Sequence, residues 1–147
     1  DKNMANVIPD SFKTDLLKGT FNFDSSGGST FKLALYTDIS GLTTSTTAFT
    51  TTNEVSTSGT SYSSGGNTLT NNGVAVSSNI AFVDFADLTF SSVTLSAVGA
   101  LIYKSGGSNE AVLVLDFGGT KTATNGDFVV QFPTASSSAA IIRLGNA

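Results

Sequence analysis

Carboxylates are the side chains best suited to chemistry in this sequence, because it contains no histidine and no cysteine. Asp84 and Asp87 lie three residues apart in FVDFAD, and Asp116 follows an apolar stretch. Glycoside hydrolysis needs two carboxyl groups about 5–9.5 Å apart in a cleft, and sequence spacing alone does not supply that distance. A three-residue spacing across a bend is more typical of carboxylates that order a turn by accepting backbone N–H groups. We therefore predict no catalytic residue and no enzymatic activity.

Metal and phosphate sites are the next candidates. Asp84, Asp87 and neighbouring carbonyl groups could offer calcium the oxygen ligands it requires, but the dense Asp/Asn/Gly ladder of a dedicated site is missing. Gly118–Thr122 follows a predicted strand, yet its spacing is not that of a P-loop. We interpret it as a loop between strands, with a further hairpin turn at Thr124–Gly126. No cofactor and no metal are expected.

The charge content excludes one class of partner. Seven lysines and arginines are scattered singly and the net charge is −4, so no basic surface is expected to bind a nucleic-acid backbone. No apolar run approaches the length of a membrane span, and the N-terminus lacks the layout of a signal peptide. We interpret Met4-Ala5 as the natural start and Asp1–Asn3 as added residues.

The aromatic residues favour a core over a sugar-binding platform. Sugar platforms present exposed Trp or Tyr, whereas this chain has no tryptophan, three tyrosines and eleven phenylalanines at alternating positions. A carbohydrate-binding module nevertheless remains one alternative.

A central hairpin organises the predicted fold. Val93–Lys104 and Glu110–Phe117 are predicted strands, and Ser105–Asn109 between them is a cluster of turn-forming residues. Ala111–Leu115 is continuously apolar, which favours a strand covered on both faces.

The N-terminal part combines an arm, a helix and a second hairpin. Residues 1–8 are the arm, and Ser11–Lys18 is a helix that Gly19 ends. Phe12 and Leu16 share one helix face and are expected to anchor it on the sheet; a partner-binding face is the alternative. Thr20–Phe23 and Phe31–Tyr36 are predicted to pair as a hairpin.

Residues 38–73 form a Ser/Thr-rich stretch with few large apolar side chains. A loop of this length inside a compact domain is usually functional or held by a partner, although a solvated loop is the simpler alternative. We expect local order at Asn53–Val55 and a turn at Gly65-Gly66. The interaction candidates in this loop are Phe49, Glu54 and Tyr62.

About eight strands are expected in total. The remaining ones are predicted at Gly73–Val76, Ala81–Phe85, Leu88–Phe90, Asp127–Phe132 and Ala139–Leu144. The fold class is mainly β: residues 9–147 form a single-domain antiparallel β-sandwich, jelly-roll or Ig-like, with one short N-terminal helix.

Several stretches together resemble a family of small virion structural proteins of tailed bacteriophages. The matching stretches, in order, are DSFKTDLLKGTFNF, FKLALYTD, NEVSTSGTSYSSGG, FADLTF, GALIYK and LDFGGTKTATNGDFVVQF. Members of the family often carry Trp at the position of Phe90 and have a shorter segment before the Gly-Gly pair.

The resemblance implies a non-enzymatic virion component. We expect a capsid decoration or cement protein on the head surface, present in several copies and forming a homo-oligomer. Its partners would be the major capsid protein or other virion proteins, with no nucleic acid and no membrane. Ala5–Ser11 is the candidate for shell contact, and the loop at 38–73 for exposure. A tail- or fibre-associated protein that aids recognition of the host surface is the main alternative.

Overall fold

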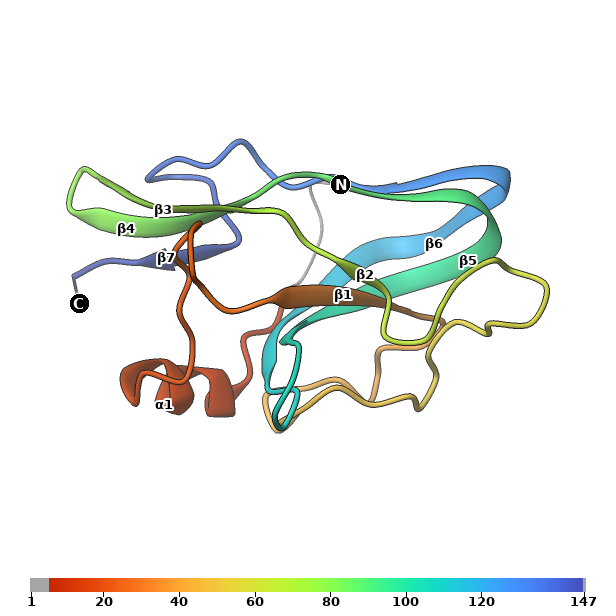
Figure 1. The fold of residues 1–147 in the computed structure, drawn as a ribbon, viewed down its shortest axis with the longest axis horizontal. Helices are drawn as coiled ribbons and strands as arrows, with labels where there is room; N and C mark the ends of the chain where they lie inside the picture. Colours follow the sequence, from red (N-terminus) through yellow and green to blue (C-terminus); the bar gives the residue numbers. More distant parts are fainter. Residues whose placement is uncertain (1–5, 147) are drawn as a thin grey trace.

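The computed structural model describes residues 6–146, and strands dominate that range (Figure 1). Its elements are α1 (Asp10–Leu17), β1 (Phe31–Tyr36), β2 (Asn67–Thr68), β3 (Asn71–Ser77), β4 (Ile80–Phe85), β5 (Leu88–Lys104), β6 (Ala111–Val130) and β7 (Ile142–Leu144). No helix within the described range has the length and apolar character needed to cross a membrane. The interpretation of Asp1–Asn3 as added residues falls outside the described part of the chain.

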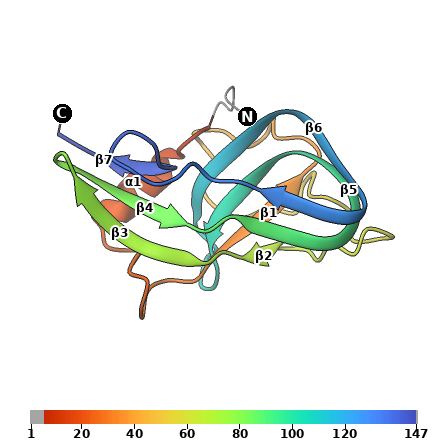
Figure 2. The ribbon, with the colours of Figure 1, turned by 90° about the horizontal axis from the view of Figure 1, so that it is seen from above.

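Within residues 6–146 the strands form two antiparallel sheets. One has the order β2-β1-β5-β6 and the other the order β3-β4-β7. Figure 2 shows the smaller sheet at one end of the molecule and the long β5–β6 pair curving over the other end. Leu33 of β1, Val83 of β4 and Ile142 of β7 belong to the same buried cluster, so the two sheets share one core. The predicted class, a single-domain antiparallel β-sandwich with one short N-terminal helix, is confirmed.

β5 and β6 are longer than the sequence predicted. We expected a break after Phe90 and a loop at Gly118–Gly126, and both predictions are wrong. The two strands stay paired across these positions, with Phe90 opposite Phe128 and Leu95 opposite Ala123. The ladder shifts register at four places. Such irregularities bend and twist a strand without ending it, so glycines that suggested a loop lie inside a curved strand.

The turn between β5 and β6 forms where the sequence predicted it. The Lys104 N–H donates to the Glu110 carbonyl at 2.9 Å, and the Asn109 N–H donates to the Gly106 carbonyl at 3.0 Å. All residues of Ala111–Leu115 are buried, which confirms that this strand is covered on both faces.

The second face of the larger sheet is covered by the segment 38–73. Leu33 and Leu35 of β1 belong to the main core, whereas Ala34 and Tyr36 on the opposite face belong to a second buried cluster. That cluster includes Leu42, with Ile39 and Phe49 packed against it. The first part of the segment therefore covers this face, and Val55, Tyr62 and Leu69 of its second part are buried in the main core, so the alternative of a purely solvated loop is wrong.

The predicted N-terminal hairpin does not form. Thr20–Phe23 is extended but lies outside every strand, because β1 is hydrogen-bonded to β5 on one edge and to β2 on the other. Phe21 and Phe23 still pack on β1 through their side chains: the Phe23 ring lies 4.6 Å from the Phe31 ring at an interplanar angle of 3°. The alternating phenylalanines of Thr20–Phe23 therefore serve side-chain packing, and the segment forms no strand pairing with β1.

Segments near both ends of the described range are attached to sheets. Val7 exchanges two backbone hydrogen bonds with Val114, of 3.0 and 2.8 Å, so this part of the predicted arm lies along β6. At the other end β7 pairs with β4, in the three residues Ile142–Leu144 instead of the predicted Ala139–Leu144. β3 is an edge strand, as predicted for Gly73–Val76, although it is longer.

Gly66 gives a stability test of this arrangement. Its φ is +76°, and a Cβ added there would overlap the carbonyl group of Leu33 on β1. We expect Gly66→Ala to lower the free energy of unfolding by more than about 2 kcal/mol, measured by urea denaturation, because backbone cannot move aside cheaply.

Gly41→Ala is the matched control, since a Cβ there meets no atom within 4 Å. It should change the free energy of unfolding by no more than about 0.5 kcal/mol. Equal effects of the two substitutions would show that the Gly66 turn does not lie against β1.

Candidate functional site

The five predicted interaction residues lie in two separate groups. Phe12 is buried in the main core, with its ring 4.9 Å from the ring of Phe21, and Leu16 packs against the same cluster. Both side chains thus attach α1 to the sheet, as the core interpretation expected. Phe49, Glu54 and Tyr62 belong to the covering segment 38–73, on which the candidate site is centred.

Phe49 and Tyr62 attach this segment to the sheet through their rings. The Phe49 ring stacks on Tyr103 of β5, with centroids 4.7 Å apart and an interplanar angle of 23°. The Tyr62 ring is buried and lies 5.8 Å from the ring of Phe90. The buried Tyr62 ring therefore offers no exposed face on which a sugar could stack, and one face of the partly buried Phe49 ring is covered by Tyr103.

Glu54 is the polar centre of the segment. Its Oε2 accepts hydrogen bonds from the Tyr62 hydroxyl and the Gly65 N–H, each at 2.7 Å, and its Oε1 accepts one from the Ser64 hydroxyl at 2.7 Å. Hydrogen bonds to an ionised carboxylate are shorter and about twice as strong as neutral ones. One side chain therefore joins two parts of the segment that are about ten residues apart in sequence.

The same residues complete the edge of β1 beyond the two-residue strand β2. The Leu35 N–H donates to the Tyr62 hydroxyl at 3.0 Å, and the Leu35 carbonyl accepts from the Val55 N–H at 2.9 Å. Glu54 also forms an isolated antiparallel bridge with Tyr36. Buried backbone groups need partners, and the covering segment supplies them where the regular ladder ends.

Three tyrosine hydroxyls work as hydrogen-bond donors around this centre. Tyr36 donates to the Thr50 carbonyl at 2.6 Å, and Tyr103 donates to the Gly65 carbonyl at 2.7 Å. Burial, reinforced by the Glu54 charge, raises the pKa of Tyr103 to about 12. Burial and Glu54 also raise the pKa of Tyr36 and of Tyr62. The phenols therefore stay protonated near neutral pH, which keeps these bonds intact.

The carboxylates considered first for chemistry each accept a hydrogen bond from a different group. Asp84 accepts from the Asn72 side-chain amide at 3.3 Å, and Asp116 accepts from the Gly118 N–H at 2.9 Å. Asp87 accepts from the N–H of Phe132 at 2.8 Å, so the expected local turn between Asp84 and Asp87 is replaced by a long-range bond. Among residues 6–146 no group of three or more Asp, Glu, His or Cys side chains could hold a metal ion.

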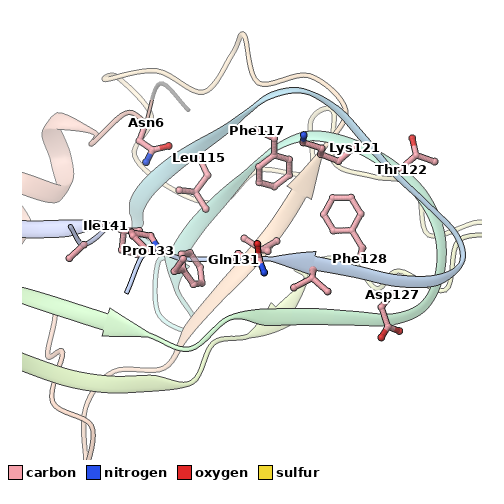
Figure 3. Close-up of a pocket in the computed structure, with 14 residues that line it drawn as sticks. Asn6, Leu115, Phe117, Lys121, Thr122, Asp127, Phe128, Gln131, Pro133 and Ile141 are labelled. Atoms are coloured by element: carbon pink, nitrogen blue, oxygen red, sulfur yellow. The ribbon is translucent and has the colours of Figure 1, made fainter. Parts of the chain in front are cut away.

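A cavity of about 600 Å³ opens where β6 folds back on itself. Figure 3 shows Leu115, Phe117 and Phe128 lining its interior, and Lys121 and Asp127 nearer its rim. The Phe117 and Phe128 rings lie 6.0 Å apart. The volume lies in the range of small-ligand sites, and the lining combines apolar side chains with polar ones that include Thr122 and Gln131.

Sequence reasoning missed this cavity for a definite reason. Its walls come from both halves of one 20-residue strand, and we had divided that strand into two with a loop between them. Sequence reasoning also missed the hydrogen-bond partners of Glu54, because Ser64 and Gly65 come close to Glu54 only when the segment folds back on itself. The polar signal that could have found the centre is a single glutamate in a segment of hydroxyl side chains.

Replacing Glu54 with Gln tests whether this carboxylate holds the segment. The amide would keep its oxygen toward Tyr62 and Gly65 and turn its N–H₂ group to the Ser64 hydroxyl, which can accept as well as donate, so what is lost is the negative charge that strengthens these bonds. We expect Glu54→Gln to lower the free energy of unfolding by about 1–3 kcal/mol in urea denaturation.

Asp24→Asn provides the matched control, because it removes one negative charge at an exposed turn. It should leave the free energy of unfolding within about 0.5 kcal/mol of the original value. If Glu54→Gln proved as harmless as Asp24→Asn, the carboxylate would not be what fixes the segment.

Comparisons with known proteins assign no family to this arrangement. No protein-family profile matches the chain, and neither a curated protein nor a solved structure matches it at a significant level.

Proposed function

We propose that this protein is a non-enzymatic structural component of a bacteriophage virion, and specifically a capsid decoration or cement protein on the head surface. The observation that carries the proposal is the covering segment 38–73, which Glu54 and three tyrosines hold on the sheet as a fixed surface. A decoration protein works through the shape it offers to its neighbours. A long segment fixed by internal bonds suits that role, because little ordering entropy is lost on docking.

The surface chemistry supports docking in preference to catalysis. The carboxylates Asp84, Asp87 and Asp116 are each engaged with different partners, and charged residues make up only 12% of the chain. The cavity beside Phe117 and Phe128, which has both apolar and polar walls, adds a socket that a side chain of a neighbouring protein could fill. We propose the major capsid protein as the principal partner, with other virion proteins as further ones.

The head is favoured over the tail because a small single domain with few charges suits a subunit repeated over a shell. A tail- or fibre-associated protein that contacts the host surface would instead be present in few copies. Copy number therefore separates the two locations.

Quantitative mass spectrometry of purified virions of the encoding phage measures this copy number directly. The proposal predicts a copy number comparable with that of the major capsid protein, and micrographs with added density across the head surface. About a dozen copies or fewer, confined to one vertex or to the tail, would assign the protein to the tail, because rings of cyclic symmetry occupy such positions. Absence from purified virions would contradict both structural roles.

A further inference from the structure

The outer edge of β3 is an unprotected strand edge. β3 pairs with β4 on one side and is the last strand of its sheet, and Figure 2 places it at the margin of the molecule. The turn at Ser25 approaches the strand only near Gly73, and all residues from Val74 to Ser77 are exposed. Edge strands are commonly protected by charges, prolines or bulges. The stretch Val74–Ser77 contains no charged residue and no proline, and its register with β4 is regular.

An exposed apolar row accompanies this edge. Val76 lies opposite Ala81 of β4, and Ala81 lies opposite Leu144 of β7. Directly opposed residues point to the same face of a sheet, so these three side chains form one row. Val76 is 71% exposed and Leu144 63% exposed, and Val74 on the same face of β3 is 57% exposed. Val83 and Ile142, in the next row of this face, are buried in the core.

The occupant of such an edge must be an extended strand, because only a strand can pair its free N–H and C=O groups in register. β3 itself meets this requirement. In an antiparallel pairing centred on Ala75, Val74 of each copy lies opposite Val76 of the other, so four valines meet on one face. No charged side chain of β3 opposes another, since the strand has none. The arrangement has two-fold symmetry and closes on itself.

We propose that β3 is a self-association edge, through which a second copy of this chain adds its own β3 in antiparallel register. The two three-stranded sheets then join into one continuous sheet across the dimer axis. The interface is small, so the dimer is weak in isolation and dissociates on dilution. This inference goes beyond the proposed virion role and does not depend on it. On a surface that binds many copies, such contacts between neighbours would add through multivalency.

Sedimentation equilibrium from about 10 µM to about 1 mM protein tests the proposal, because weak dimers form in this range. The average mass should rise toward that of a dimer with concentration. It should not fall when salt is added, because the contact is apolar and the chain's net charge of −4 is screened by salt.

Two matched substitutions locate the contact. Val76→Lys places a charge in the valine cluster and should raise the dissociation constant at least about tenfold. Val129→Lys makes the same change at an exposed valine of β6, where Val129 is 48% exposed, and should leave association unchanged. Circular dichroism of both variants should retain the β spectrum of the parent chain, which separates loss of association from loss of folding.

Amide hydrogen exchange provides the second readout and is independent of any substitution. At high concentration the amides of Val74–Ser77 that point away from β4 should gain protection, while those of exposed turns elsewhere should not. A chain that stays monomeric at about 1 mM would overturn the proposal and leave this edge for a strand of another partner. The proposal would also be overturned if Val129→Lys weakened association as much as Val76→Lys does. Protection from exchange that spread over the whole surface would overturn it as well.

Discussion

The hydrogen bonds of the Glu54 carboxylate are the constraint on which the arrangement of this protein depends. They close residues 54–65 on themselves through Tyr62, Ser64 and Gly65, and this closed part of the segment 38–73 then supplies the partners that Leu35 needs on the edge of β1. The earlier part of the same segment, through Ile39, Leu42 and Phe49, covers one face of the larger sheet, whose strands are apolar on both faces. A buried two-faced sheet and a polar covering segment therefore require each other.

Predictions from the sequence were accurate where the local pattern decides the structure, and wrong where pairing between distant residues overrides that pattern. The turn at Ser105–Asn109 and the apolar run Ala111–Leu115 depend on neighbouring residues, and both are found. Thr20–Phe23 has the alternation of a strand, but β2 and β5 occupy the edges of β1. Gly118–Gly126 carries turn-forming residues, yet β5 holds it in a curved ladder.

The candidate site was predicted only in part, for the same reason. Phe49, Glu54 and Tyr62 stood out as isolated large or charged residues in a hydroxyl-rich stretch, and all three connect that stretch to itself or to the sheet. Their distances and partners depend on contacts between distant residues, and so does the cavity formed by the two halves of β6. A pattern of residue types does not contain that information.

The central claim is that segment 38–73 is part of the cooperative fold and presents a fixed surface. Native-state hydrogen exchange under weakly denaturing conditions tests this claim most directly, because it reports the opening free energy of each amide. The amides of Val55 and Gly65, which are bonded to Leu35 and Glu54, should open with the same free energy as core amides of β6 such as that of Leu115, which pairs with Ala100 of β5. The claim would be contradicted if Val55 and Gly65 exchanged by local opening, with an opening free energy several kcal/mol below that of global unfolding.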